Sequence, residues 1–445
     1  AVAVAAPAFN RSALQAQLQG LIDRNVRDAA ALVLDNASGE VLAYVGSARL
    51  GPQPSQVDGV RALRQAGSTL KPILYGLALE HRYLTAASLL DDSPVRLQTS
   101  GGLYIPQDYD HDFRGLVSVR SALAGSLNVP AVRTLVLVGQ QPFLERLQAF
   151  GYASIDQPAD YYGYSLALGS AEVNLLEQAN AYRALANGGQ WSPLRFVPGE
   201  PAPPSRAVMA PQAAYVVGDI LSDRGSRAVT FGLDSPLATA FWSAVKTGTS
   251  KFMRDNWCIG WSARYTVAVW VGNFDGQPMR EVSGVSGAAP AWLEIISALE
   301  GGAHTPPPAA PPGVVSSEVR YADNVEPPRR EWFLQGTELA RVEAAPAASL
   351  KPRLESPPAG MIVGLDPDIP AGRQQVLFRA QPRKASLKFV LDGKRLASAE
   401  REYLWAPVPG AHVLALVDEQ GKEFDRVEFS VRGGPVVQQA KVGAP

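Results

Sequence analysis

Gly67-Ser-Thr-Leu-Lys-Pro72 is the stretch from which the fold of this chain can be worked out. It opens an apolar run whose spacing predicts a helix from Leu70 to Leu79. Proline is tolerated only in about the first turn of a helix, so Pro72 places Ser68 at the N-terminus, where free backbone N–H groups can stabilise an oxyanion. Lys71 lies three residues after Ser68 on the same face, within reach of its hydroxyl. The pattern suits a serine nucleophile, but a helix cap beside a solvated lysine fits it as well.

Two further motifs carry hydroxyl, amide and amine groups. Ser126-Leu-Asn128 lies in a stretch that we predict to be helical, Val117–Val138, and taken alone it indicates a helix-breaking junction. Lys246-Thr-Gly-Thr249 follows a strand-like segment, and its glycine removes a side chain where a backbone or a ligand must come close. A Walker A loop is excluded because Val245, not glycine, precedes the lysine. Since Ser243-Ala-Val-Lys246 repeats the Ser-x-x-Lys spacing, spacing alone does not choose the nucleophile.

The order of elements predicts an α+β fold. Strands are expected near both ends of the first 300 residues, with helices inserted between them, which is an α+β arrangement. After Pro358 the pattern alternates at period two and predicts a β-sandwich. Two proline-rich stretches, His304–Gly313 and Pro346–Pro358, separate the parts. We therefore expect a domain at 1–303, a proline-rich linker with an Arg-Glu-Trp-Phe segment at 304–354, an all-β domain at 355–433 and a tail at 434–445. The patch Arg329–Thr337 is too small for a core of its own, and its two aromatics are expected to lie against a neighbour. The strands expected are 30–34, 41–45, 241–246, 257–261, 266–271, 376–379, 387–391, 413–417 and 426–432, and the further helices are 171–186, 211–221 and 288–299.

Composition excludes several functions. Lys and Arg number 41 against 42 Asp and Glu, so no basic field draws the chain to nucleic acid. The single Cys258 cannot close an internal disulfide, the four histidines lack zinc-ligand spacing, and we predict neither metal nor cofactor. No apolar run reaches the ~18 residues of a membrane span. Because the chain starts at Ala1 without an initiator Met, we expect a processed or trimmed product.

Other residues that attract notice have structural explanations. Cys258 lies in an apolar strand and is expected to be a buried hydrophobe rather than a reactive thiol. The tryptophans at 257, 261 and 270 are expected in the core rather than as a stacking platform. The acidic loop 108–113, which contains His111, is expected to be a solvated turn or a cleft rim, with a calcium site as the lesser alternative.

In this order, the motifs at Ser68, Ser126 and Lys246 resemble those of the serine penicillin-recognising enzymes. The stretch Asp255–Gly276 resembles the segment after Lys-Thr-Gly in class A penicillin-binding proteins, and Leu168-Gly-Ser170 and Asn180–Gly188 resemble another family segment. The C-terminal part resembles the tail of the C type; the stretches that carry this are Arg330–Thr337, Leu365–Pro370 and Leu391–Gly393. The resemblance implies a β-lactamase/transpeptidase-like α+β fold followed by an Ig-like sandwich. The family's glycosyltransferase signature and membrane anchor are not in this sequence, so no glycan polymerisation is implied.

The implied activity is that of a peptidoglycan DD-transpeptidase. Ser68 would attack a D-Ala-D-Ala bond, and Lys71, kept neutral by desolvation and by the cation Lys246, would take its proton. Ser126 would relay the proton to the leaving amine and Asn128 would orient Lys71. The resemblance makes Thr247, Gly248 and Thr249 substrate-binding residues beside Lys246, with an oxyanion hole at the backbone N–H groups of Ser68 and Thr249.

The implied partners are stem peptides, β-lactams as inhibitors and a periplasmic protein at the sandwich, with no nucleic acid. The implied location is the periplasm, and full-length relatives are anchored in the bacterial inner membrane. Three alternatives remain: a penicillin-binding sensor or scaffold with little turnover, a DD-carboxypeptidase and a β-lactamase. Rapid hydrolysis is disfavoured because Glu177-Gln-Ala-Asn180 lacks the leucine and the spacing of the class A β-lactamase deacylation motif.

Overall fold

The chain divides into two compact units, Ala1–Ala344 and Ala345–Pro445. The computed structural model describes residues 2–50, 56–95, 97–99, 102–104, 106, 113–302, 306–343, 352–365, 374–381 and 383–432. The acidic loop predicted at 108–113 lies outside these residues except for Phe113, and so does the predicted tail. The predicted domain limits at 303, 354 and 433 stay predictions.

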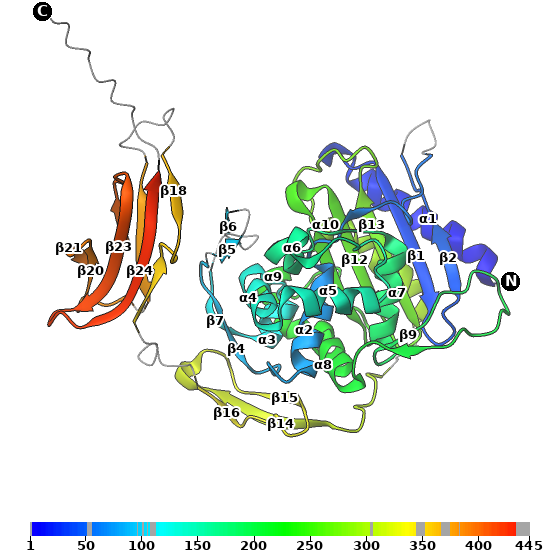
Figure 1. The fold of residues 1–445 in the computed structure, drawn as a ribbon. Coiled ribbons are helices and arrows are strands. Elements are labelled where there is room, and N and C mark those ends of the chain that lie inside the picture. The colour runs from blue at the N-terminus through cyan, green and yellow to red at the C-terminus, as the bar shows by residue number, and fades with distance from the viewer. Residues whose placement is uncertain are drawn as a thin grey trace, which may run out of the picture. The chain divides into compact units, whose positions relative to one another are not determined.

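A five-stranded antiparallel sheet forms the centre of the first unit (Figure 1). β1 comes from near the N-terminus and pairs along its whole length with β13, from Asp28 opposite Gly272 to Asp35 opposite Tyr265. Strands from both ends of the unit thus share one sheet, which confirms the predicted α+β arrangement. In sheet order the strands are β11 (Ala244–Thr249), β12 (Asp255–Trp261), β13 (Tyr265–Gly272), β1 (Asp28–Asp35) and β2 (Val41–Val45).

Helices cover both faces of this sheet, so its strands read as nearly continuous apolar runs. On one face Cys258 and Val269 pack with Trp292 and the apolar stripe of α1, and on the other Trp257 and Trp270 pack beneath the larger helical part. No helix in the described part of the chain is long and apolar enough to cross a membrane. The first face carries α1 (Val2–Gly20), α10 (Gly284–Gly287) and α11 (Ala289–Glu300), and the helical part contains α2 (Lys71–Glu80), α3 (Val119–Ala124), α4 (Asn128–Val138), α5 (Gln140–Ala149), α6 (Ala159–Tyr162), α7 (Leu175–Ala186), α8 (Pro211–Ser222) and α9 (Arg224–Phe231).

Short elements connect these helices and strands. The 3-10 turns are η1 (Ile22–Arg24), η2 (Gly67–Leu70), η3 (Gly163–Leu168), η4 (Lys251–Met253) and η5 (Ala322–Asn324). Two-stranded ribbons pair β3 (Arg64–Gln65) with β8 (Glu172–Val173), β4 (Leu89–Asp92) with β7 (Gly115–Ser118), β5 (Leu97–Thr99) with β6 (Gly102–Tyr104), and β9 (Gln190–Trp191) with β10 (Arg206–Ala207). The predicted helix at 171–186 begins only at Leu175, because Asn174 caps it in a capping box with Glu177.

Residues 314–342, which we call the arm, form a small sheet within the predicted linker segment. The sheet has the order β15-β14-β16, from β14 (Val314–Tyr321), β15 (Arg329–Leu334) and β16 (Arg341–Val342) (Figure 1). Leu334 belongs to the core beneath the helices, and Trp332 meets Tyr215 of α8 edge to face at 5.4 Å. The arm is therefore packed into the first unit through its aromatic and apolar side chains.

The second unit is all-β, as predicted. Its two sheets share one core, in which Phe378 meets Phe389, Phe429 and Trp405. One sheet has the order β17-β19-β22 and the other β18-β24-β23-β20-β21. The strands are β17 (Arg353–Ser356), β18 (Ile362–Gly364), β19 (Val376–Gln381), β20 (Leu387–Leu391), β21 (Lys394–Ser398), β22 (Tyr403–Trp405), β23 (Gly410–Asp418) and β24 (Glu423–Arg432).

Candidate active site

Ser68 lies in the 3-10 turn η2, which leads directly into α2. In a 3-10 turn the side chains at i and i+3 are eclipsed, so Ser68 and Lys71 project to the same side. Pro72 lies in the first turn of α2, where a backbone N–H would have no acceptor within the helix, so its missing N–H costs no helical hydrogen bond. Two hydrogen bonds from α7 to the buried Thr69 fix the turn. Thr69 Oγ1 accepts from Gln178 Nε2, and the Thr69 carbonyl oxygen accepts from the Tyr182 hydroxyl at 2.8 Å. The predicted helix start at Ser68 is confirmed.

Lys71 is fully buried, and its amine points to the segment between α3 and α4. Nζ donates to the carbonyl oxygens of Ser126 and Leu127 at 2.7 and 3.0 Å, and to Asn128 Oδ1 at 2.7 Å. Asn128 therefore contacts Lys71 directly, and its role in orienting Lys71 stays a prediction.

The stretch Val117–Val138, predicted to be helical, consists of two helices, α3 and α4, which are separated at Ser126. The helix-breaking junction that Ser126-Leu-Asn128 indicated is thus confirmed. Ser126 has a φ of 61°, in the left-handed region that non-glycine residues rarely enter. Pro130 lies in the first turn of α4, where a helix accepts it, and would have interrupted a continuous helix. The break turns the Ser126 hydroxyl and the Asn128 amide toward Lys71 and Lys246.

β11 carries the Lys246-Thr-Gly-Thr249 motif at the edge of the central sheet. Lys246 Nζ donates to Ser126 Oγ at 2.7 Å, so Ser126 contacts one lysine through its hydroxyl and the other through its carbonyl. A Cβ on Gly248 would lie 2.7 Å from Thr69 Cγ2 and 2.8 Å from the Ala66 carbonyl. The expected close approach at this glycine is thus confirmed, and the backbone that approaches is the Ser68 turn.

The pKa of Lys246 is held well below its usual range, first by burial and then by the positive charge of Lys71. We expected Lys246 to be the cation that keeps Lys71 neutral, whereas the surroundings disfavour charge on Lys246 itself. A carboxylate bound beside Lys246 would raise this pKa again, because an opposite charge favours the ammonium form.

The proposed site residues meet in one cleft of ≈ 980 Å³. Ser68, Ser126 and Asn128 line it together with Thr247 and Thr249. Lys71 and Lys246 lie behind this surface, and Gly248 is buried against the Ser68 turn. None of the described residues that line the cleft is an aspartate or a glutamate.

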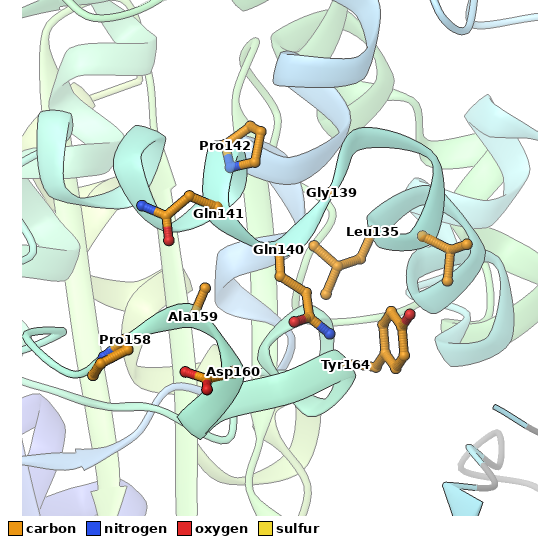
Figure 2. A pocket seen from close by; sticks show the side chains of 10 residues that line it. Leu135, Gly139, Gln140, Gln141, Pro142, Pro158, Ala159, Asp160 and Tyr164 are labelled. Atoms are coloured by element: carbon orange, nitrogen blue, oxygen red, sulfur yellow. The ribbon is translucent and has the colours of Figure 1, made fainter. Parts of the chain in front are cut away.

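A second hollow of ≈ 530 Å³ lies where α4 is followed by α5 and α6. Figure 2 shows Gln140, Asp160 and Tyr164 around it. No hydroxyl paired with an amine lines this hollow, and none of the proposed site residues does. The cleft at Ser68 is therefore the candidate active site.

Sequence reasoning missed residues that hold the cleft together. Gly67 has a φ of 57° and donates to the Gly169 carbonyl at 3.0 Å, and a Cβ on Gly169 would lie 1.9 Å from the Gly67 carbonyl oxygen. The backbone N–H of Gly284 donates to Thr249 Oγ1 at 3.0 Å and fixes that side chain. Gly67 and Gly169 lie in stretches that the sequence had singled out, but a glycine marks a close approach without indicating its partner, and Gly284 carried no other signal.

The remaining sequence expectations concern residues outside the cleft. Cys258 is a fully buried free cysteine, and the tryptophans at 257, 261 and 270 are core residues, so both predictions are confirmed. Ser243 contacts Thr239 at 2.9 Å, and in extended chain a residue three positions before Lys246 points to the opposite face. Glu177 caps α7 and accepts from Ser154 N and Oγ at 2.9 and 2.6 Å.

The fold and the three-motif cleft can be compared with known families. The model described as "Penicillin binding protein transpeptidase domain" matches residues 29–293, which is more than half of the chain. The chain belongs to this family. A second model, "Penicillin-Binding Protein C-terminus Family", matches residues 341–429, within which most of the second unit's strands fall.

Curated relatives include penicillin-binding protein 1C of Escherichia coli K12, 36% identical over 272 residues, or 61% of this chain. Penicillin-binding protein 1A of Neisseria flavescens is 31% identical over 311 residues, or 64% of the chain. The matched regions span only 34% and 37% of those proteins, so this chain corresponds to about a third of their length.

Solved structures support the fold. Penicillin-binding protein 1A of Haemophilus influenzae aligns with a TM-score of 0.59 at 23% identity, over 70% of this chain and 54% of that one. PonA1 of Mycobacterium tuberculosis in complex with penicillin V aligns with a TM-score of 0.57 at 23% identity, over 68% of this chain and 85% of that one.

Proposed function

We propose that the first unit is a peptidoglycan DD-transpeptidase that works through a Ser68 acyl-enzyme. The observation that carries the proposal is the link that Ser126 makes between Lys71 and Lys246, beside Ser68 in a single cleft. Acyl transfer requires a nucleophile, a base and a group that delivers a proton to the leaving amine. Ser68, Lys71 and Ser126 are the corresponding groups here. Membership of the transpeptidase family supports this reaction class.

In the first half-reaction, Ser68 Oγ attacks the carbonyl carbon of the penultimate D-Ala and its proton passes to Lys71 Nζ. Nζ donates to the Ser126 and Leu127 carbonyls and to Asn128 Oδ1, which hold it in place. Lys71 enters this step as the neutral amine, its ammonium proton having passed to water in the free enzyme. The C–N bond breaks as Ser126 passes its hydroxyl proton to the departing D-Ala amine and takes up the proton held by Lys71. Lys71 is then a neutral amine again, and an ester remains on Ser68. The backbone N–H groups of Ser68 and Thr249 are proposed to stabilise the oxyanion.

In the second half-reaction an acceptor amine attacks the ester. A new peptide bond forms, and the amine proton returns through Lys71 to Ser68 Oγ. β11 is an edge strand, so an extended donor peptide can add to it by main-chain hydrogen bonds. Lys246, Thr247 and Thr249 are then proposed to hold the terminal carboxylate, whose charge favours the ammonium form of Lys246.

Several features favour transfer to an amine over rapid hydrolysis. No carboxylate lines the described part of the cleft, and Glu177 is engaged in capping α7 and in binding Ser154. β-Lactams are proposed to acylate Ser68 as mimics of the donor peptide. We further propose that the chain acts in the periplasm of a bacterium, as its relatives are bacterial proteins, and that the second unit binds a periplasmic partner.

The test is D-Ala release from a stem-peptide or thioester donor, with and without a D-amino acid as acceptor. We expect release that the acceptor accelerates, with an exchanged product, and none from Ser68→Ala. Release into water alone would support a DD-carboxypeptidase. Stable penicillin labelling without any release would support a sensor or scaffold.

A further inference from the structure

Arg120 of α3 is buried, with only 4% of its surface exposed, and three carboxylates surround it. Its Nε and Nη2 donate to the two carboxylate oxygens of Glu331 at 2.8 and 2.5 Å, in the two-point geometry that an arginine makes with a carboxylate. Nη2 and Nη1 also donate to Asp219 and Asp223 at 2.5 and 3.0 Å. Glu331 belongs to the arm and Arg120 to the helix before Ser126, so a buried ion pair joins the two.

The arm also holds the residue that caps this helix at its N-terminus. Ser118 is the N-cap of α3, and its backbone N–H donates to Glu326 Oε1 at 2.7 Å. Arg329 donates to Ser118 Oγ at 2.9 Å and reaches Glu326 at 2.5 Å and Glu331 at 3.1 Å. Two arm carboxylates and one arm guanidinium therefore fix α3 at its N-terminal turn.

The other end of α3 leads into the active site. The helix is only six residues long, Gly125 follows it, and Ser126 comes next with its left-handed φ of 61°. A residue in such a conformation keeps it only when its surroundings determine it. The hydrogen bonds from Lys71 and Lys246 converge on Ser126, and the arm fixes the helix on its other side.

Building on the proposed function, we propose that Glu331 and Glu326 of the arm are positioning residues for Ser126. They act through Arg120 and Ser118 to set where α3 ends, and thereby place the Ser126 hydroxyl against Lys246 and its carbonyl against Lys71. The arm is then part of the catalytic apparatus, although it follows the last strand of the central sheet by some forty residues and contributes nothing to the described lining of the cleft.

Electrostatics agree with this placement. Burial opposes the charge of Glu331, but the hydrogen bond and the charge of Arg120 lower its pKa below the usual value. Glu331 is thus a carboxylate at neutral pH, and its neutralisation leaves Arg120 with the two aspartates of the α8 end alone. Asp219 and Asp223 belong to α8 and its C-cap, so the carboxylate that ties Arg120 to the arm is then lost.

The experiment compares Glu331→Gln with Glu318→Gln in the full chain. Glu318 is an exposed glutamate of the same arm and serves as the matched control. Stopped-flow acylation with a fluorescent penicillin gives the noncovalent affinity, the acylation rate constant and the labelled fraction. We expect Glu331→Gln to lower the rate constant about tenfold or more, since a shift well under 1 Å slows a positioned reaction. The affinity should stay within threefold, and the full protein should still be labelled.

Other outcomes overturn the positioning role. If Glu331→Gln lowers only the labelled fraction or the melting temperature while the rate constant stays at the wild-type value, the ion pair is merely structural. If Glu331→Gln does not fold, Glu326→Gln replaces it, because that variant leaves the contact between Arg120 and Glu331 in place. An acylation rate constant at least threefold below the wild-type value in Glu326→Gln supports the proposal. An unchanged acylation rate constant refutes it. A wild-type protein that takes no label at Ser68 would refute the proposed function and this inference together.

Discussion

Gly248→Ala tests whether β11 and the Ser68 turn are held together by close backbone contact. The new Cβ would lie 2.7 Å from Thr69 Cγ2 and 2.8 Å from the carbonyl oxygen of Ala66. An ordinary contact begins near 3.4 Å, so the strand and the turn must separate by about 0.6 Å, an overpacking strain that typically costs ~1–3 kcal/mol. The same shift moves Thr249 away from Ser68 and widens the proposed oxyanion hole.

We expect acylation by a fluorescent penicillin to slow by roughly 10- to 100-fold, because misplacement of this size is costly in a positioned reaction. Urea unfolding followed by tryptophan fluorescence gives the free energy of unfolding of the same protein. Gly364→Ala is the matched control, since Gly364 also lies in a strand and a Cβ there meets nothing within 4 Å. Wild-type acylation together with wild-type stability in Gly248→Ala would refute the packing described for the cleft.

Further tests change Lys246, Ser243 of the second Ser-x-x-Lys pair, and the second unit. Lys246→Met removes a buried amine whose pKa is depressed in the folded protein. In the unfolded chain Lys246 keeps its proton up to about pH 10.5, whereas in the folded protein it releases the proton at a lower pH. The free energy of unfolding of the wild type should therefore rise relative to that of the variant, by up to about 1.4 kcal/mol per pH unit, as the pH rises toward 10.5. A pH-independent difference in urea unfolding would contradict this. Ser243→Ala should acylate within about twofold of the wild type, and a label on Ser243 would show that the wrong Ser-x-x-Lys pair had been chosen. Deletion of residues 346–445 should also leave the acylation rate nearly unchanged, because the first compact unit ends at Ala344; a large loss in a truncated protein of native circular dichroism would show that the second unit shapes the cleft.

The local parts of the site could be predicted from the sequence. The relation between Ser68 and Lys71 follows from three-residue spacing in a turn that Pro72 locates. The α+β sheet followed from strand-like segments at both ends of the first unit, and Gly248 indicated a close approach. In each case, neighbours in sequence carry the information.

Long-range features escaped prediction for physical reasons. The sequence indicated a junction at Ser126 but not its partners, which are far away in the chain: the Ser126 carbonyl accepts from Lys71, and its hydroxyl accepts from Lys246. Arg120 and Glu331 are 211 positions apart, so no local pattern connects them. The aromatics of Arg329–Thr337 indicated a contact with a neighbour, but not that β15 would meet α8 through Trp332 and α3 through Glu331.

Whether Ser68 forms a stable acyl-enzyme is tested most directly by the intact mass of the protein after reaction with a penicillin. The mass is followed over hours, and the labelled residue is located by peptide digestion. A transpeptidase protects its ester from water, and no described residue lining the cleft is a carboxylate that could activate a water. We predict one penicilloyl group per chain, attached to Ser68 and persisting for hours, with none on Ser68→Ala. A label on another residue, an adduct that survives Ser68→Ala, or hydrolysis within seconds would contradict the account.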